Sequence, residues 1–276
     1  MAFAPVPQEP KKQIDKAGKI LISGPERHGK AYYDALELAN KWRACHAYPI
    51  NTFQSTLRVK IRNIFLGREP IVAQRLKRMP TIIDKLNRLS PNMQLTTMQD
   101  IGGVRAILET VDSVYRLAHE YRNSQRLMHE LTQEKDYIKN PRDEDGYRSL
   151  HLIYKYKNKL APAYNGLRLE LQIRTKLQHI WATAVETMGT FLGQDLKSRK
   201  GERAWIDFFA VTSSAFAHQE KSPLVPRYNH LSLIDTCRAV AEAEAKIRAL
   251  ETMEALAMAA DNIVAMGGTR RVGPII

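Results

Sequence analysis

The clearest pattern along the chain is an alternation of apolar and polar side chains between Leu167 and Arg174. A period of two places neighbouring side chains on opposite faces of a β-strand, so this segment predicts a strand with one buried face. Its polar face would carry Arg168, Glu170, Gln172 and Arg174. One carboxylate would therefore share a face with two guanidinium groups and an amide, although a strand with one solvated face would show the same alternation.

Two neighbouring segments add polar groups to this strand. A second strand, predicted over Tyr147–Tyr156, would place Ser149 and His151 on the same face as its first residue. A helical period predicts a helix over Leu177–Phe191, with His179 on a polar face. Three consecutive segments with clustered polar side chains favour an active site over an ordinary solvated surface.

The remaining periodicities complete the expected fold. They predict helices over Ala31–His46, Arg68–Arg88, Val111–Tyr121 and Leu231–Met266, and a strand over Gly103–Leu108. Leu57–Ile61 is ambiguous, Ala163–Gly166 indicates a hairpin-like turn, and residues 1–13 indicate a Pro-rich flexible lead. The order of elements predicts an α/β (α+β) fold in which helices pack on a mixed β-sheet.

The same pattern suggests three regions along the chain. We expect a lead and first helix, a central domain and a C-terminal helical extension, over residues 1–50, 51–215 and 216–276. The C-terminal helix could pack on its own domain, or it could serve self-association or a partner helix.

Basic residues crowd one segment of the central region. Between residues 58 and 88 the only acidic residues are Glu69 and Asp84, whereas the basic ones are Arg58, Lys60, Arg62, Arg68, Arg75, Lys77, Arg78, Lys85 and Arg88. Such a composition suits phosphate binding. A basic helix face can also be solvated or contact nucleic acid, so composition alone leaves these alternatives open.

Two glycine-containing segments differ in what they predict. Asp100 precedes Ile101-Gly102-Gly103, where small residues let the backbone turn and a metal ion approach. The segment Gly24–Lys30 has the spacing of a phosphate-binding loop but lacks the Ser or Thr that would hold magnesium. We therefore expect it to be a loop that opens a helix, with the ATP site elsewhere.

Four ordered blocks resemble the synthetase domain of RelA/SpoT-type alarmone synthetases, over roughly Arg58 to Phe191. They are Arg75-x-Lys77-x-x-x-Thr81-Ile-x-x-Lys85, Asp100-Ile-Gly-Gly-Val-Arg105, Asp136 to His151 with its Gly-Tyr-x-Ser-x-His ending, and Leu169-Glu-Leu-Gln-Ile-Arg-Thr175 with His179 downstream. Each block is weakly specific by itself. Their occurrence together in this order makes the resemblance strong.

The resemblance implies an enzyme that moves a pyrophosphate from ATP to a ribose 3′-hydroxyl on a nucleotidyltransferase-like sheet. It implies Mg²⁺ held by Asp100 and Glu170, with Glu170 as metal ligand or general base. It assigns ATP binding to Arg58, Arg75, Lys77, Lys85 and Arg105. It assigns acceptor binding to Lys139, Arg142, Tyr147, His151, Gln172 and Arg174, with Tyr147 stacked on the base and His179 in a supporting role.

One loop departs from the family's pattern. The family usually has Pro-Lys-x-Asn-Gly-Tyr, whereas this chain has Pro141-Arg-Asp-Glu-Asp-Gly-Tyr147, one residue longer and without Asn before the glycine. Arg142 keeps the positive charge of Lys but changes the geometry of its donors. Because this loop would touch the acceptor, the departure bears on the acceptor more than on the reaction type.

Three functions follow from these observations. The first is synthesis of (p)ppGpp from ATP and GDP or GTP. The second is a toxin that pyrophosphorylates the tRNA 3′ end, because some small members of the family act in this way. The third is a non-catalytic RNA-binding protein on the same fold, which the presence of both Asp100 and Glu170 disfavours.

Composition sets limits on these readings. The 276 residues are 44% hydrophobic, enough for a full core, and the net charge of +13 suggests contact with a polyanion such as tRNA or the ribosome, or steering of phosphates. We expect no membrane span and no signal peptide, hence a cytoplasmic protein. The two cysteines, Cys45 and Cys237, are far apart and without metal-site spacing, which fits reduced thiols.

A further expectation concerns control of the product. No His-Asp metal cluster of the family's hydrolase domain is visible in the sequence, so we expect no product hydrolysis on this chain. Control would then come from a homo-oligomer, a small ligand, expression or a neutralising antitoxin partner.

Overall fold

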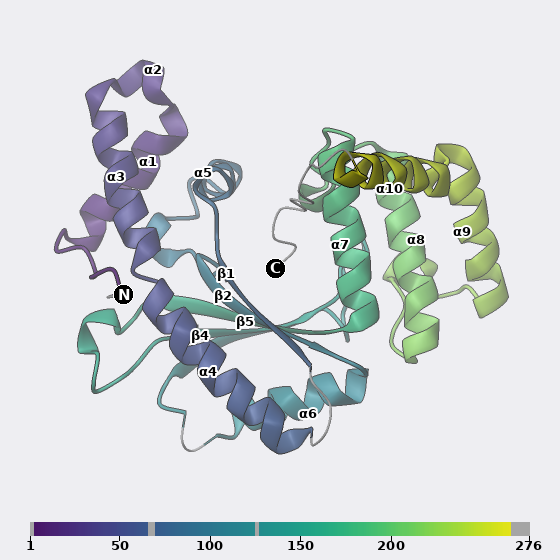
Figure 1. Cartoon of the computed structure of the whole chain (residues 1–276), viewed down its shortest axis with the longest axis horizontal. Coiled ribbons are helices and arrows are strands. Elements are labelled where there is room, and N and C mark those ends of the chain that lie inside the picture. Colours follow the sequence, from purple (N-terminus) through teal and green to yellow (C-terminus); the bar gives the residue numbers. More distant parts are fainter. Residues whose placement is uncertain (1–2, 66–69, 125–126, 266–276) are drawn as a thin grey trace. The chain divides into compact units, whose positions relative to one another are not determined.

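The computed structural model describes residues 3–65, 70–124 and 127–265 of the chain. Its centre is a mixed five-stranded sheet with the order β1-β2-β5-β4-β3. The strands are β1 (Ile71–Leu76), β2 (Gly102–Leu108), β3 (Glu130–Asp136), β4 (Leu150–Lys155) and β5 (Arg168–Thr175). The sheet and its packed helices confirm the fold class expected from the sequence (Figure 1).

The helices of the described residues precede, follow and separate these strands. In chain order they are α1 (Lys11–Ser23), α2 (Pro25–His28), α3 (Lys30–Ala44), α4 (Ala47–Ile64), α5 (Met79–Arg88), α6 (Val111–Arg122), α7 (Lys176–Phe191), α8 (Arg203–Glu220), α9 (Leu233–Ile247) and α10 (Ala249–Ala265). None of the helices in this part of the chain has the length and apolarity needed to cross a membrane.

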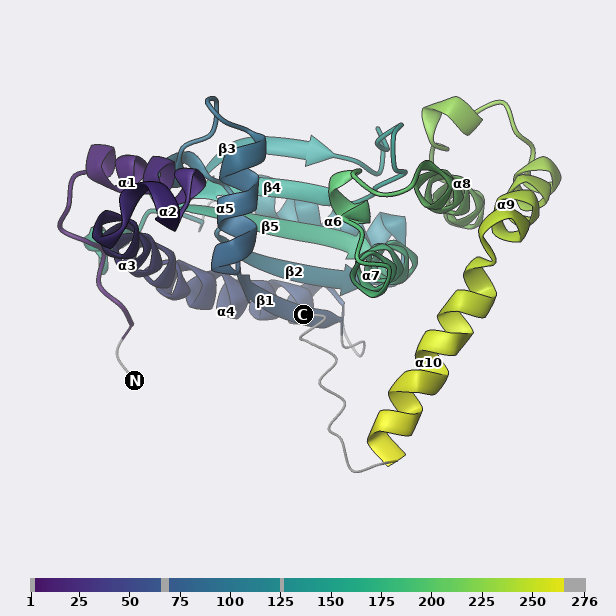
Figure 2. The ribbon, with the colours of Figure 1, turned by 90° about the horizontal axis from the view of Figure 1, so that it is seen from above.

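The chain folds as two compact units that interleave along the sequence. Unit 1 comprises residues 1–106, 115–135 and 151–173, and unit 2 comprises residues 107–114, 136–150 and 174–276. In unit 1, α4 and most of α6 cover one face of the sheet, and α5 lies on the other face (Figure 2).

Regular spacing of large apolar residues fixes α4 on the sheet. Phe53, Leu57 and Ile61 recur every four residues, so they share one face of the helix, and all three are buried. Burial of such side chains contributes about 1.5–3 kcal/mol each. The ambiguous segment Leu57–Ile61 is therefore a helix, held by contact with the sheet.

The core of unit 2 is aromatic. Trp181 of α7 packs with Trp205 and Phe209 of α8, and its indole Nε1 donates a hydrogen bond of 2.7 Å to the carbonyl of Phe209. The start of α7 is fixed by a capping box, in which Thr175 Oγ1 accepts from the amide of Gln178 and Gln178 Oε1 accepts from the amide of Thr175. This confirms the helix predicted from the sequence.

Most of the other strand and helix predictions are confirmed. β2, α6, α3 and β5 lie within one or two residues of their predicted bounds. The turn before Gly166 joins the neighbouring strands β4 and β5, as expected for a hairpin.

The single helix predicted over Arg68–Arg88 is wrong. Its first two residues lie outside the described residues, and the rest form strand β1 followed by helix α5. The sequence carried a signal for this division, because Pro80 lies in the first turn of α5, where proline marks a helix start. The β-branched pair Ile71-Val72 also favours a strand.

The second predicted strand begins later than expected. β4 starts at Leu150, and Tyr147–Ser149 form irregular backbone, so the predicted alternation of faces does not extend over them. Gly146 has φ +76°, its carbonyl accepts a 2.6 Å hydrogen bond from Ser213 Oγ of α8, and Arg148 Nε donates to the same hydroxyl. Contacts with α8 therefore hold this segment out of the sheet.

The predicted C-terminal helix is divided into two. Arg248 adopts φ +50° between α9 and α10, and its amide donates to the carbonyl of Glu244 at 2.7 Å. No glycine or proline marks this break in the sequence. The end of the predicted helix and the tail that follows it lie outside the described residues.

The flexible lead predicted at the N-terminus is also corrected. Residues 11–13 begin helix α1, whose residues Ile14, Ala17 and Leu21 are buried against α3 and α5. Strand β3 and helix α8 had no counterpart in the prediction. β3 has a largely exposed burial pattern, which weakens the alternation that identifies a strand.

We expect Gly146→Ala to destabilise unit 2. An added Cβ would lie 2.8 Å from Ser213 Cβ and 2.9 Å from Ala210 Cα, and the positive φ adds backbone strain. The free energy of unfolding should fall by about 2–4 kcal/mol, the sum of overpacking and strain. Urea denaturation followed by circular dichroism measures it.

Gly166→Ala is the matched control for this substitution. Gly166 has φ +86°, but an added Cβ would meet no atom within 4 Å. It should therefore cost only the strain, about 1–2 kcal/mol. An equal loss of stability in the two variants would show that the contact with α8 does not constrain the loop.

Candidate active site

Three charged side chains of unit 1 meet on the α5 face of the sheet. Lys77 follows β1, Lys85 lies on α5, and Asp100 precedes β2. The Nζ atom of Lys77 lies 3.1 Å from Asp100 Oδ2, and that of Lys85 lies 2.8 Å from Asp100 Oδ1. The backbone of Lys77 is also fixed, because its amide donates to the carbonyl of Ile101 at 2.8 Å.

The electrostatics of this cluster keep Asp100 ionised. Burial opposes ionisation of Asp100, but the two lysines outweigh it and hold the pKa of the carboxyl well below its usual range. Burial lowers the pKa of Lys77, and the charge of Asp100 opposes this effect. Two cations thus lie close together around one carboxylate. Such a pair of ammonium groups can also bind the anionic oxygens of a phosphate.

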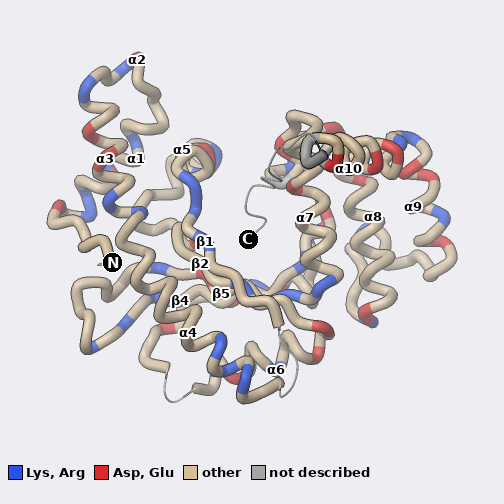
Figure 3. Tube along the Cα trace, viewed as in Figure 1, with Lys and Arg blue, Asp and Glu red and all other residues tan. Residues whose placement is uncertain are grey.

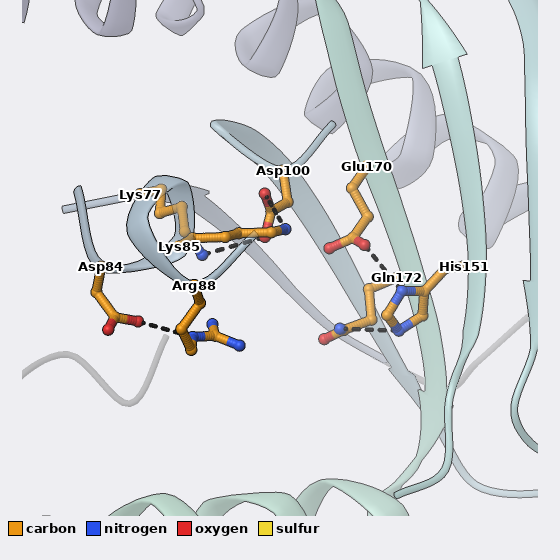
Figure 4. Close-up of polar contacts among 8 residues, drawn as sticks. All are labelled: Lys77, Asp84, Lys85, Arg88, Asp100, His151, Glu170 and Gln172. Carbon is orange, nitrogen blue, oxygen red and sulfur yellow. Dashed lines mark hydrogen bonds and ion pairs between the residues drawn. The ribbon is translucent and has the colours of Figure 1, made fainter. Parts of the chain in front are cut away.

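A second polar group of unit 1 crosses strands β2, β5 and β4. Arg105 Nε donates to Gln172 Oε1 at 2.7 Å, Gln172 Nε2 lies 3.2 Å from His151 Nε2, and His151 Nδ1 lies 2.8 Å from Glu170 Oε1. Figure 4 shows Glu170, Gln172 and His151 in this arrangement, with Asp100 nearby.

A series of contacts places the histidine between an amide and a carboxylate. Because Arg105 donates to the oxygen of the Gln172 amide, the amide nitrogen faces His151 Nε2. The other ring nitrogen of His151, Nδ1, faces the carboxylate of Glu170 and donates to it. The carboxylate of Glu170 is therefore oriented from behind by a relay that begins at Arg105.

The pKa of Glu170 lies below its usual value. Burial opposes ionisation, but the charge and hydrogen bond of His151 outweigh it. The charge of Asp100 acts in the opposite direction and raises the pKa of Glu170. The two carboxylates therefore repel each other, a condition that a divalent cation bound to both would relieve.

Four of the five predicted ATP-binding residues lie in or near these two polar groups, whereas Arg58 does not. Lys77, Lys85 and Arg105 belong to the two groups described above, and Arg75 lies close enough for its charge to affect the pKa of Lys77. Figure 3 shows basic positions on both β1 and α5. Arg58 is exposed on α4, which covers the other face of the sheet, and no polar contact joins it to these groups in the described structure.

Sequence reasoning missed one residue next to this cluster. Arg43 of α3 donates from Nε to the carbonyl of Lys77 at 2.5 Å. Its distance from Lys77 in the sequence hid this contact. The structure also places Gln172 against His151 and His151 against Glu170, while the binding of acceptor phosphates by His151 and Gln172 stays a prediction.

The remaining predicted acceptor residues lie in unit 2. Arg142 places its guanidinium 4.5 Å from the ring centroid of Tyr147, and Arg174 Nη2 donates to His179 Nδ1 at 2.6 Å. His179 is therefore held by a neighbouring side chain, and its supporting role stays a prediction. Lys139 lines a surface hollow of about 540 Å³ together with His218 and Ser222.

Helix α8 supports the segment that carries Tyr147. Arg148 is buried, donates to Ser213, and its charge is opposed by burial, which lowers its pKa to about 10. Glu220, at the end of the same helix, accepts hydrogen bonds from Thr175 and Gln178 at the start of α7. The supporting helix lies more than 50 residues beyond the Tyr147 motif in the sequence, so the motif itself gave no sign of it.

Part of the chain is similar in sequence to known proteins. A family model described as "Region found in RelA / SpoT proteins" matches residues 74–189. GTP pyrophosphokinase YwaC of Bacillus subtilis is 32% identical over 127 residues, which cover 44% of this chain and 59% of that protein. GTP pyrophosphokinase YjbM of the same organism is 33% identical over 113 residues, 41% of this chain and 52% of that protein.

A solved structure shows the same fold. Small alarmone synthetase 2 from Bacillus subtilis aligns with a TM-score of 0.53 at 22% identity, covering 64% of this chain and 91% of that chain. The chain spans only a little over half the length of the two curated relatives, whereas it spans nearly all of this structure. Residues 74–189 of the chain therefore match the region found in RelA/SpoT proteins, and the chain is similar in fold to a small alarmone synthetase.

Proposed function

We propose that this protein is an ATP-dependent pyrophosphotransferase that makes (p)ppGpp from ATP and GDP or GTP. The observation that carries the proposal is the ionised Glu170, oriented by His151 and Gln172 within the RelA/SpoT region. The names of the two curated relatives support the reaction type. Residues 51–215 are the proposed catalytic domain, since the matched region lies within them.

The donor side of the reaction uses the cations of unit 1. Arg75, Lys77, Lys85 and Arg105 would neutralise the polyphosphate of ATP, whereas the exposed Arg58 is not part of this proposal. Positioning of the phosphates and neutralisation of their charge are the main tasks of a phosphoryl-transfer enzyme. Lys77 and Lys85 are held by Asp100 before a substrate binds, so little reorganisation is needed.

Magnesium fits the two carboxylates of this group. Mg²⁺ binds through one or two carboxylates together with substrate phosphates and water. Asp100 and Glu170 are both ionised and repel each other, and they would hold the ion. When bound, the ion would polarise phosphoryl oxygens and neutralise the charge that develops during transfer.

The transfer itself needs a base and an attacking hydroxyl. Glu170 takes the proton of the ribose 3′-hydroxyl, whose oxygen attacks the β-phosphorus of ATP. The bond between that phosphorus and the α,β-bridging oxygen breaks, AMP leaves, and the pyrophosphate is attached at the 3′ position. His151 directs the carboxylate through its Nδ1 and keeps it ionised until it takes this proton.

The acceptor side uses residues of unit 2. Tyr147 would stack on the guanine base, a contact worth about 1–3 kcal/mol for comparable stacks. Lys139, Arg142 and Arg174 would bind acceptor phosphates. Their cationic side chains suit the phosphates of GDP and GTP.

We expect Glu170→Gln to reduce transfer at least about 100-fold, because the amide cannot accept the proton. Purified protein is incubated with Mg²⁺, γ-labelled ATP and, separately, GDP, GTP or deacylated tRNA, and the labelled products are separated. The wild type should label GDP or GTP. Label on tRNA alone would support the toxin reading, and label on neither would contradict pyrophosphate transfer.

The control for this substitution is Glu130→Gln on β3. Glu130 is an exposed carboxylate of the same sheet, paired with Lys155 at 3.2 Å. Its removal should leave the rate unchanged. Full activity in the Glu170→Gln protein would contradict the assignment of the base.

The relay behind Glu170 predicts a change in the pH profile. Because the pKa of Glu170 is lowered, its carboxylate stays ionised at neutral pH, and activity is lost only as pH falls through that pKa. His151→Ala removes the contact that lowers the pKa. The acid limb of the kcat/KM profile should therefore move to higher pH.

His151→Asn provides the conservative comparison, since its amide nitrogen can still donate. Its acid limb should lie between those of the wild type and the alanine variant. Profiles are measured over the pH range in which circular dichroism shows all three proteins folded. Identical acid limbs would show that His151 does not set the ionisation of Glu170.

A further inference from the structure

The face of Tyr147 is covered by a side chain of its own loop. The Arg142 guanidinium lies over this ring at 4.5 Å and also lies 5.8 Å from the ring centroid of Tyr137. Tyr137 and Trp181 meet Tyr147 at steep interplanar angles of 73° and 60°. A nucleobase stacks on the flat face of an aromatic ring, so Arg142 occupies a surface that an acceptor base would use.

One carboxylate fixes both the ring and the guanidinium. Asp145 Oδ2 lies 2.8 Å from Arg142 Nη2, and Asp145 Oδ1 accepts a 3.0 Å hydrogen bond from the amide of Tyr147. The loop backbone closes around this pair, since the amide of Gly146 donates to the carbonyl of Arg142 at 2.9 Å. Asp145 therefore sets the position of Arg142 relative to the ring.

This covered arrangement is one that a ligand can open. The Nε of Arg142 is buried without a hydrogen-bond partner among the described residues, and such an unsatisfied donor destabilises the arrangement that buries it. Burial also raises the pKa of Asp145, which means that burial disfavours the ionised carboxylate that pairs with Arg142. A phosphate group offers a guanidinium several oxygens and stronger, charge-assisted hydrogen bonds.

We propose that Asp145 is a specificity-determining residue, which holds Arg142 over Tyr147 until a phosphate of the acceptor takes its place. The proposal rests on the proposed function, and it concerns how the acceptor is selected. A nucleoside without phosphate has nothing to exchange for Asp145, so it meets a covered ring. A nucleoside diphosphate both draws Arg142 away and stacks on the ring it uncovers.

The departure of this loop from the RelA/SpoT pattern gives the proposal its test. The family usually has Asn before this glycine, and an Asn cannot form the ion pair with Arg142. Asp145→Asn keeps an oxygen that can accept from the amide of Tyr147, while it removes the charge. Asp143→Asn is the matched control, because Asp143 lies in the same loop but accepts its hydrogen bond from the amide of Arg227, at 2.8 Å.

The experiment measures dissociation constants of GDP and guanosine by titration calorimetry, together with KM for ATP. Asp145→Asn should bind GDP roughly fivefold more tightly, the size expected when a contact of this kind is lost. KM for ATP and the GDP affinity of the Asp143→Asn protein should not change. Unchanged or weaker GDP binding by Asp145→Asn would overturn the proposal.

A second variant guards against a loop that merely misfolds. Arg142→Met removes the guanidinium from the ring and should improve guanosine binding while it weakens GDP binding. A disordered loop would weaken both, and that result would also overturn the proposal.

The transfer assay separates this proposal from the proposed function. If the wild type transfers pyrophosphate to GDP and Asp145→Asn shows no gain in affinity, the role of Asp145 is wrong and the function stands. If the wild type transfers to no guanine nucleotide, the function is wrong. The affinities of the two ligands then decide the role of Asp145 independently.

Discussion

The ion pairs of Asp100 with Lys77 and Lys85 are the interaction on which the polar face of unit 1 depends. A buried ammonium group is costly unless an opposite charge and hydrogen bonds accompany it, and Lys77 is only 7% exposed. Asp100 satisfies Lys77 and at the same time joins the end of β1, helix α5 and the turn before β2. The main chain of Lys77 is held by Ile101 on one side and Arg43 on the other. The cations are therefore held in place in the protein by itself, which is what the proposed catalysis would require to avoid reorganisation.

In both units, contacts with neighbouring residues hold the predicted site residues in place. In unit 1, the relay from Arg105 through Gln172 and His151 directs one carboxylate. In unit 2, contacts with α8 hold the backbone before Tyr147, and Asp145 holds Arg142 over its ring. In each unit, a side chain that the proposed reaction would use is thus held by a neighbouring side chain: Glu170 by His151, and Arg142 by Asp145.

The sequence identified strand β5 and helix α7 more readily than the long-range contacts around them. Alternation from Leu167 to Arg174 correctly identified β5, because a buried sheet face imposes that pattern. β1 was hidden because Arg75 and Lys77 were interpreted as part of a basic helix, although Pro80 marks the true helix start. The contacts of Arg43 and Ser213 join residues far apart in the chain, and local patterns carry no information about such pairs. His151 shows the same limit, since its motif gave no sign that its position on β4 places it against Glu170.

The attachment point of the transferred group tests the account most directly. The product formed from ATP and GDP can be purified and its phosphorus nuclei correlated with the ribose protons by NMR. The new phosphorus should couple to H3′, since Glu170 is proposed to deprotonate the 3′-hydroxyl. Coupling to H2′, an extended 5′ chain without a new ribose contact, or the absence of any product would contradict it.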